Sequence, residues 1–273
     1  MTTRKVEFRN SNNEKLAALL NLPVDRQPVA FAIFAHCFTC TKNIKAAANI
    51  SRTLAQEGIA VLCFDFTGLG ASEGEFANSN FSSNVDDLLQ AADYLQREFK
   101  APALLIGHSL GGAAVIQAAS KLEAVRAVIT IAAPSDPEHV VKQFAVKKEE
   151  IISAGEAEVE LGGRRFKVKK QFIDDLQGHQ LEEILADLNK PLLVMHSPFD
   201  QVVSIDNAAT IFKAAKHPKS FISLDTADHL LSNELDAVYA GRMAVTWARK
   251  FLGMRRKDPG VIHPDNKVVA HIE

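Results

Sequence analysis

The sequence ALLIGHSLGG, at residues 103–112, is an apolar run that ends in a glycine-flanked serine. A helix-compatible segment, AAVIQAASK, follows it at residues 113–121. A strand, a sharp turn and a helix form the setting in which a serine is held in a strained backbone conformation with its hydroxyl exposed. Gly107 and Gly111 lie two residues on either side of Ser109, where side chains would collide as the strand and the helix pass closely. We therefore predict that Ser109 is a nucleophile.

The length and composition of the chain are those of an ordinary globular protein. With 273 residues, of which 47% are hydrophobic and 23% charged, the chain can bury one large core with a small inserted module. The net charge of −2 attracts neither nucleic acid nor an anionic membrane, so neither partner is expected. The first residues carry no apolar leader, no apolar run reaches 18 residues, and three cysteines are too few for a disulfide framework. We predict a cytoplasmic protein without a membrane span.

Apolar runs alternate with helical patterns along most of the chain. Residues 5–8 and 15–20 flank a polar turn and predict an opening hairpin. The clearest helix is 84–99, with Ser83 as its cap and acidic residues, including Asp87, in its first turn. An antiparallel entry followed by alternating strands and helices predicts a mostly parallel sheet covered on both faces. The other expected strands are 29–35, 60–64, 103–106, 127–132, 192–195 and 220–224, and the other expected helices are 44–56, 207–215 and 234–251.

One segment breaks this alternation and divides the chain. Residues 134–190 are rich in charge, predict a hairpin around Gly162 and Gly163, and predict one or two short helices over 172–188. Because the segment follows the sixth strand, we interpret it as a cap over the site, rather than as a solvated surface insertion. The core then comprises 1–133 and 191–253. Residues 254–273 form a polar tail or linker, in which 267–273 predict one strand.

A serine hydroxyl needs a base to accept its proton and an acid to orient that base. In a doubly wound sheet these groups come from loops at the carboxyl edge of the strands. His229 meets this demand, because it lies just past the strand 220–224 and before the final helix. Asp200 follows the preceding strand and is the predicted acid. Asp225 and Asp228 are competitors, but an aspartate so close in sequence to the base more often shapes its loop.

The other histidines are predicted to have no catalytic role. His36 and His108 adjoin other motifs and are expected to pack locally, and His196 lies at a strand end. The remainder fall in the cap, in a surface turn or in the tail: His139, His179, His217, His263 and His271.

The oxyanion of a tetrahedral intermediate needs two preorganised N–H donors. The backbone N–H of Leu110, immediately after the nucleophile, is the first predicted donor. The second is predicted to be the backbone N–H of Phe38, in the loop that follows the strand 29–35.

Five motifs together carry a resemblance to a known family. They are AHCF at 35–38, DFTGLGASEG at 65–74, GHSLGG at 107–112, HSPFD at 196–200 and ADHLLS at 227–232. The chain resembles the serine hydrolases of the α/β-hydrolase fold, of the group with serine aminopeptidase-like esterases and lysophospholipases. The order Ser109, Asp200, His229 is the order of that fold. The resemblance implies an α/β fold with a mostly parallel eight-stranded sheet, helices on both faces, a small inserted cap and no cofactor.

The resemblance also extends to a subgroup and assigns one motif a structural role. The sequence AHCFTC and the hairpin sequence in the cap resemble the hydrolase half of bacterial fusions that carry an OsmC-like domain. An OsmC-like domain or partner is therefore expected beyond the tail. The turn at 65–74 matches a structural motif of the family, in which Asp65 is expected to fix loops.

Cys37 departs from the family's pattern, in which a glycine follows the histidine of this loop. Glycine permits a backbone angle that cysteine resists, so either the loop adopts an allowed variant or the oxyanion hole is partly misformed. Cys37 and Cys40 also form a C-x-x-C, the spacing of a thiol-redox motif. We favour a structural role for both, because the next helix begins near Ile44 and its dipole does not reach Cys37. A disulfide between them would distort the hole and silence an esterase under oxidation. No metal site is expected from three cysteines without a histidine partner.

Two hypotheses follow for the function. The first is a carboxylesterase that cleaves small-to-medium acyl esters through an acyl-Ser109 intermediate, with an apolar pocket lined by phenylalanines. The second is a weakly active hydrolase-like module with a thiol-redox or docking role at Cys37 and Cys40, beside an OsmC-like partner. The phenylalanines considered for the pocket are Phe34, Phe38, Phe66, Phe76, Phe144, Phe172 and Phe199.

Overall fold

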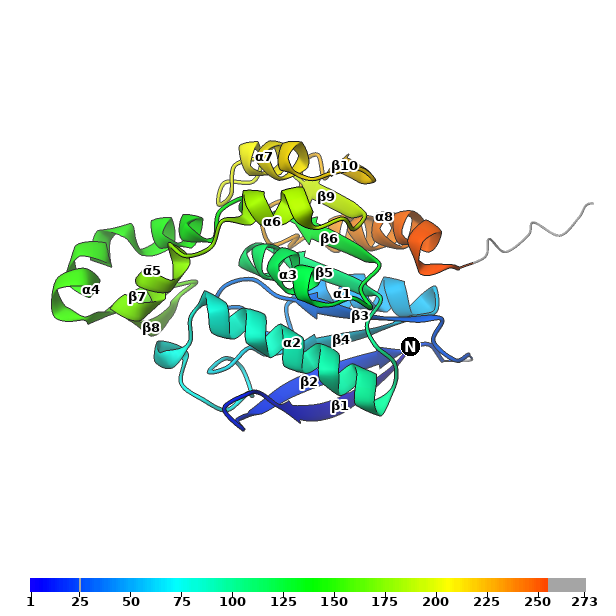
Figure 1. Cartoon of the computed structure of the whole chain (residues 1–273), viewed down its shortest axis with the longest axis horizontal. Helices are drawn as coiled ribbons and strands as arrows, with labels where there is room; N and C mark the ends of the chain where they lie inside the picture. Colours follow the sequence, from blue (N-terminus) through cyan, green and yellow to red (C-terminus); the bar gives the residue numbers. More distant parts are fainter. Residues whose placement is uncertain (25, 255–273) are drawn as a thin grey trace, which may run out of the picture.

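A computed structural model describes residues 1–24 and 26–254, which are built around one eight-stranded sheet (Figure 1). The strand order is β1-β2-β4-β3-β5-β6-β9-β10. The pairs β1–β2 and β2–β4 are antiparallel, and every other neighbouring pair is parallel. The predicted opening hairpin and mostly parallel sheet are confirmed. The strands are β1 (Thr2–Arg9), β2 (Lys15–Leu22), β3 (Ala30–Ala35), β4 (Ile59–Phe64), β5 (Leu104–His108), β6 (Ala127–Ile131), β9 (Leu192–His196) and β10 (Lys219–Ser223).

Helices cover both faces of the sheet because the central strands are apolar on both sides. In β3, Ala32 and Phe34 face one cluster, whereas Phe31 and Ile33 face the other, as the two-residue period of a strand requires. Helices α1 (Lys45–Gln56) and α8 (Glu234–Leu252) pack against each other on the first face. The second face is covered by α2 (Phe81–Glu98), α3 (Leu110–Lys121), α6 (Leu181–Asp187) and α7 (Asp206–Ala214).

The start of α2 differs from the predicted one. Asn80 is the N-cap and Ser83 is the third helical residue, and the two residues form a reciprocal capping box. The prediction of Ser83 as the cap was therefore wrong by three residues. The hydroxyl of Ser83 instead accepts a hydrogen bond from the backbone N–H of the actual cap, Asn80. Asp87 is buried and accepts hydrogen bonds from the N–H and the hydroxyl of Thr67, so it fixes a loop and is not a first-turn charge.

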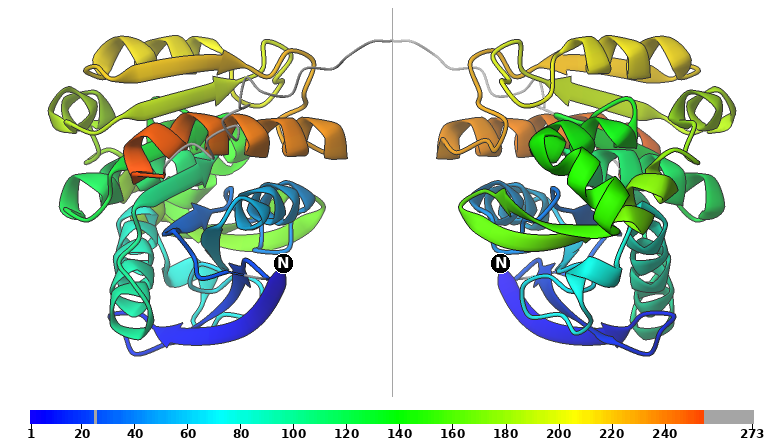
Figure 2. Two further views of the ribbon diagram at one scale, coloured as in Figure 1. Left: turned by 90° about the vertical axis from the view of Figure 1, so that its right-hand side faces the viewer. Right: turned by 90° about the vertical axis from the view of Figure 1, so that its left-hand side faces the viewer.

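The chain between β6 and β9 leaves the sheet and forms a projecting unit (Figure 1). It contains η2 (Pro137–Lys147), α4 (Lys148–Ala154), the antiparallel hairpin of β7 (Glu156–Leu161) and β8 (Arg164–Lys169), and α5 (Lys170–Leu176). Figure 2 (right) views the molecule from this side, with these green segments in front. The predicted hairpin and short helices are confirmed, whereas η2 and α4 were not anticipated. Helix α6 packs on α3 and α7, so it belongs to the layer that covers the sheet.

Two further expectations concern the membrane and the tail. No helix among the described residues combines the length and the apolar character needed to cross a bilayer. The strand predicted at 267–273 lies outside the described residues.

Candidate active site

Ser109 occupies a sharp turn between β5 and α3. Its φ of 54° lies in the left-handed region, which is a strained conformation for a residue with a side chain. The N–H of Ser109 donates to the carbonyl of Ile131 on the neighbouring strand at 2.9 Å, and this bond helps to hold the turn. A Cβ at Gly107 would lie 2.2 Å from the carbonyl oxygen of Gly111, so the predicted close passage of strand and helix is confirmed.

His229 and Asp200 meet Ser109 at the carboxyl edge of the sheet. The Oγ of Ser109 lies 2.9 Å from Nε2 of His229, and Nδ1 of His229 lies 2.7 Å from Oδ2 of Asp200. All three residues are buried. The carboxylate of Asp200 also accepts the N–H groups of Val202 and Val203 at 2.8 and 2.9 Å. The structure thus brings together three side chains that the sequence separates by up to 120 positions.

The surroundings of Asp200 favour its negatively charged form, which is the form that can stabilise a protonated His229. Burial by itself would raise the pKa of Asp200, but hydrogen bonds from His229 and from the backbone of Val203 and Val202 outweigh it and lower the pKa below the usual value. The competitors Asp225 and Asp228 are exposed, and Asp228 accepts the backbone N–H of Ser232 at 2.8 Å.

Two further histidines support the triad; His108 was predicted to pack locally, and His196 was predicted only to lie at a strand end. Nε2 of His108 donates to the backbone carbonyl of His229 at 2.6 Å. Nε2 of His196 donates to the carbonyl of Val203 at 2.8 Å, on the loop that carries Asp200. These contacts were not predicted from the sequence, although His108 precedes the nucleophile directly and His196 ends the strand before the acid. Both histidines thereby hold the backbone of the triad's loops.

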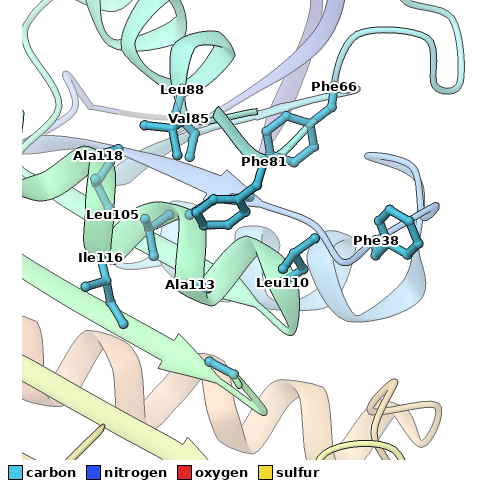
Figure 3. Packing of buried hydrophobic residues seen from close by; sticks show 14 of the residues in the cluster. Phe38, Phe66, Phe81, Val85, Leu88, Leu105, Leu110, Ala113, Ile116 and Ala118 are labelled. Carbon is cyan, nitrogen blue, oxygen red and sulfur yellow. The ribbon is translucent and has the colours of Figure 1, made fainter. Parts of the chain in front are cut away.

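A loop of residues 36–42 follows β3 and passes beside the start of α3. A Cβ at Gly111 would lie 2.4 Å from the carbonyl oxygen of His36, which shows how close the two segments are. Figure 3 shows Leu110 at the start of α3 and Phe38 on the neighbouring loop. Within residues 1–24 and 26–254, the backbone N–H groups of Phe38 and Leu110 donate to no protein acceptor. Both groups thus meet one condition for an oxyanion donor, which is an N–H without a protein acceptor.

The cysteines of this loop form a disulfide between Cys37 and Cys40. The N–H of Cys40 donates to the carbonyl of Cys37 at 3.1 Å and closes a four-residue turn. Thr39 has a φ of 60°, as the third position of a type II turn requires, so the left-handed conformation falls on Thr39 and not on Cys37. Cys37 therefore avoids the conformation that a glycine would relieve, and Thr39, a β-branched residue, carries the strain instead.

The far end of the loop is anchored by a buried ion pair. The ammonium and the backbone N–H of Lys42 both bind the carboxylate of Asp65, which also accepts the N–H of Ala71 at 2.9 Å. Both side chains are buried. Asp65 therefore joins two loops, as expected from the motif at 65–74.

No metal or thiol site accompanies this arrangement in the part of the chain that the structure describes. No group of three or more His, Cys, Asp or Glu side chains there is arranged to hold a metal ion. Cys63 lies in the core beside Ser51, and burial raises the pKa of its thiol to about 12. Cys63 is therefore an inert core residue.

The phenylalanines considered for an apolar pocket separate into different environments. Phe34 is buried in the cluster on the α1–α8 face, and Phe199 is 60% exposed. Phe38, Phe66 and Phe76 line a small cavity of about 10 Å³ beside the 36–42 loop, which suffices for about one water. The ring centroid of Phe38 also lies 5.3 Å from that of Phe172 and 6.4 Å from that of Phe144. Both partners belong to the segment between β6 and β9.

The buried histidines predict a pH-dependent stability. Burial lowers the pKa of His108 to about 3, whereas the unfolded chain keeps a value near 6.5. Unfolding therefore takes up a proton between these values, and stability falls as the pH drops below 6.5. His108→Gln keeps a donor for the carbonyl of His229 but does not titrate. Between pH 7 and pH 5 this variant should lose about 2 kcal/mol less unfolding free energy than the parent, measured by urea unfolding. Equal losses in the two proteins would contradict the prediction.

Comparisons with known proteins agree with this fold. Residues 27–155 match the family model described as serine aminopeptidase, S33. The esterase domain of a Rhodothermus marinus protein is 50% identical, with a TM-score of 0.76, over 93% of this chain and 100% of that one. The chain belongs to the α/β-hydrolase superfamily.

Two curated relatives are more distant. Mitochondrial palmitoyl-protein thioesterase ABHD10 of Rattus norvegicus is 26% identical over 85% of this chain and 71% of its own length. Monoglyceride lipase of Homo sapiens is also 26% identical, over 70% of this chain and 72% of its own length. The resemblance inferred from the five motifs is thus confirmed at the level of the superfamily.

Proposed function

We propose that the protein is a serine carboxylesterase that cleaves small-to-medium acyl esters through an acyl-Ser109 intermediate. The observation that carries this proposal is the continuous hydrogen-bonded chain from Ser109 through His229 to Asp200, beside two free backbone N–H groups. Acyl transfer requires a nucleophile bonded to a base and a base oriented by an acid, and this hydrogen-bonded chain supports both. We propose that the two N–H groups are the donors for the oxyanion.

Each group has a defined role in the proposed reaction. The hydroxyl of Ser109 attacks the ester carbonyl while Nε2 of His229 accepts its proton, and Asp200 stabilises the imidazolium. The N–H groups of Phe38 and Leu110 bind the oxyanion of the tetrahedral intermediate. When this intermediate collapses, the C–O bond to the alcohol breaks and His229 returns the proton to the leaving oxygen. Water, activated by the same histidine, then hydrolyses the acyl enzyme.

The relatives support ester chemistry without defining the substrate. The esterase domain, the thioesterase and the lipase named above are all described as cleaving ester or thioester bonds. The rings around Phe38 are largely buried and make this side of the proposed oxyanion site apolar, which favours an apolar acyl group. We propose the segment 134–190 as a cap that supplies Phe144 and Phe172 to this group of rings.

A p-nitrophenyl ester series from acetate to decanoate tests the proposal. We expect saturable hydrolysis that is fastest for the shorter chains. A fluorophosphonate probe should label a single peptide, the one that contains Ser109, as mapped by mass spectrometry. Labelling of any other serine, or the absence of both turnover and label, would remove the proposed function.

A second candidate role, thiol-dependent control, is favoured by the disulfide between Cys37 and Cys40. The turn that this disulfide closes presents the free N–H of Phe38, so we propose that the disulfide stiffens the loop. The sequence analysis expected the disulfide to distort the oxyanion hole and lower activity, whereas this proposal expects it to support the hole and raise activity. Disulfides are rare in reducing compartments, so the pair would be mostly reduced in the predicted cytoplasmic location. An OsmC-like partner remains a prediction.

Reduction of this disulfide should lower esterase activity. Dithiothreitol delivers two electrons and two protons to the disulfide and is itself oxidised to a cyclic disulfide, which frees Cys37 and Cys40 to separate. We expect kcat to fall about fivefold relative to diamide-treated protein, because a looser loop holds the Phe38 N–H less well. The double variant C37S/C40S should show the lower rate under both conditions, and Cys63→Ala should keep the parent's response. Equal parent activity in both reagents would exclude thiol control.

A further inference from the structure

The side chain of Arg164 connects the β7–β8 hairpin to the 36–42 loop. Arg164 is the first residue of β8, and its guanidinium donates to the backbone carbonyl of Thr39. The two residues are 125 positions apart in the sequence. Arg164 is exposed, so this hydrogen bond is not a by-product of core packing.

The carbonyl of Thr39 is the outer end of a relay of two peptide units. The peptide that carries the Thr39 carbonyl also carries the N–H of Cys40, which donates to the carbonyl of Cys37 at 3.1 Å. The peptide that carries the Cys37 carbonyl also carries the free N–H of Phe38. In a trans peptide the C=O and the N–H point in opposite directions, so each bond in the relay sets the direction of the next.

The carbonyl of Cys37 has a second donor that fixes the same peptide. Nδ1 of His36 donates to this carbonyl at 2.9 Å. Burial lowers the pKa of His36 to about 4, so the ring is neutral at pH 7, with its proton on Nδ1. Lys42 and Arg164 are the two cations that act on His36; the ammonium of Lys42 is paired with Asp65, whereas Arg164 binds a carbonyl of the relay itself.

We propose that Arg164 is a positioning residue for the oxyanion hole, acting through the Thr39–Cys40 and Cys37–Phe38 peptides on the N–H of Phe38. A guanidinium keeps its positive charge at all relevant pH values and forms charge-assisted hydrogen bonds. Hydrogen bonds in a chain polarise one another, so a cation at one end strengthens the donor at the other. The inference rests on the proposed esterase function, and it assigns to the hairpin an indirect part in stabilising the transition state.

Aromatic contacts hold the hairpin against the loop. The guanidinium of Arg164 lies 5.1 Å from the ring centre of Phe166 on the same strand. Phe166 packs on Phe76 at 4.8 Å, and Phe76 packs on Phe38 at 5.6 Å. The relay and this row of rings thus link the same two segments. The rings supply apolar contact area, whereas Arg164 orients the peptide units of the relay and supplies a positive charge.

Substitution of Arg164 tests the proposal, with Arg165 as a matched control. Arg165 is the next residue of the hairpin, is also exposed, and approaches Glu158 at 4.0 Å instead of the loop. We expect Arg164→Met to lower kcat for p-nitrophenyl butyrate about tenfold with little change in KM, because only the transition state carries the oxyanion. Affinity for a trifluoromethyl ketone, whose adduct with serine carries an oxyanion, should fall by a similar factor. Arg164→Lys should recover part of both, and Arg165→Met should stay within twofold of the parent.

A second measurement does not depend on turnover. Hydrogen–deuterium exchange of the peptide that spans residues 36–42 should be several-fold faster in Arg164→Met than in Arg165→Met. Unchanged kcat and ketone affinity in Arg164→Met, a change in KM alone, or an equal loss in Arg165→Met would overturn the proposal. If the parent itself neither turns over esters nor labels at Ser109, the proposed function fails. Unchanged exchange in Arg164→Met would then overturn the positioning role as well.

Discussion

Ser109→Ala should lower kcat/KM for p-nitrophenyl butyrate by at least about 10⁴-fold. The substitution removes the only atom that forms the acyl bond, so the two-step reaction is lost and only binding and oxyanion stabilisation remain. The small residual rate should no longer show an initial burst of p-nitrophenol, because no acyl enzyme accumulates. Stopped-flow absorbance and steady-state assays measure both effects.

Ser120→Ala is the matched control for this prediction. Ser120 is an exposed residue of the same helix, α3, and its hydroxyl donates to the carbonyl of Gln117. This variant should keep parental activity. If the parent and Ser109→Ala showed the same trace activity, the enzyme hypothesis would fail in favour of a feeble hydrolase-like module.

Asp200→Asn should lower kcat by about 10³- to 10⁴-fold with a folded site. An asparagine amide that donates to Nδ1 of His229 would stabilise the wrong tautomer, in which Nε2 carries the proton and cannot accept one from Ser109. The charge that stabilises the imidazolium is lost as well. The substituted amide would keep one oxygen for the N–H groups of Val202 and Val203, so we expect the loop to persist. Circular dichroism and a thermal melt check the fold, and steady-state kinetics check the loss.

Asp228→Asn makes the same chemical change one residue from His229. Its carboxylate is exposed and accepts the N–H of Ser232, so activity should remain within about threefold of the parent. Should Asp228→Asn be the impaired variant and Asp200→Asn the active one, the acid would have been assigned to the wrong side chain.

Much of the architecture was predictable from local sequence. The strand that precedes Ser109 is continuously apolar, and the two glycines around it are needed where β5 and α3 pass closely. These are short-range constraints, so the sharp turn at Ser109 can be predicted from about ten residues of sequence. His229 and Asp200 required one further step, because strands of a parallel sheet bring their carboxyl ends to one edge. That rule places loops together without specifying which atoms touch.

Local patterns failed where a longer-range contact decided the outcome. Asp87 suits the first turn of a helix, but it is buried against Thr67, and α2 begins earlier at a capping box from Asn80. The C-x-x-C spacing indicated that Cys37 and Cys40 were close, but it did not show which residue of the loop takes the left-handed conformation. The closed turn places that conformation on Thr39.

The sheet, the order of the elements and the three side chains of the proposed triad were therefore predictable from the chain alone, because apolar periodicity and glycine spacing are encoded locally. The contacts that hold these side chains in place depend on how the whole chain folds. His108 reaches the backbone carbonyl of His229, and Arg164 reaches Thr39 from a separate hairpin. A hydrogen bond between segments more than 100 residues apart depends on how several packed elements align, and no short pattern in either segment records that alignment.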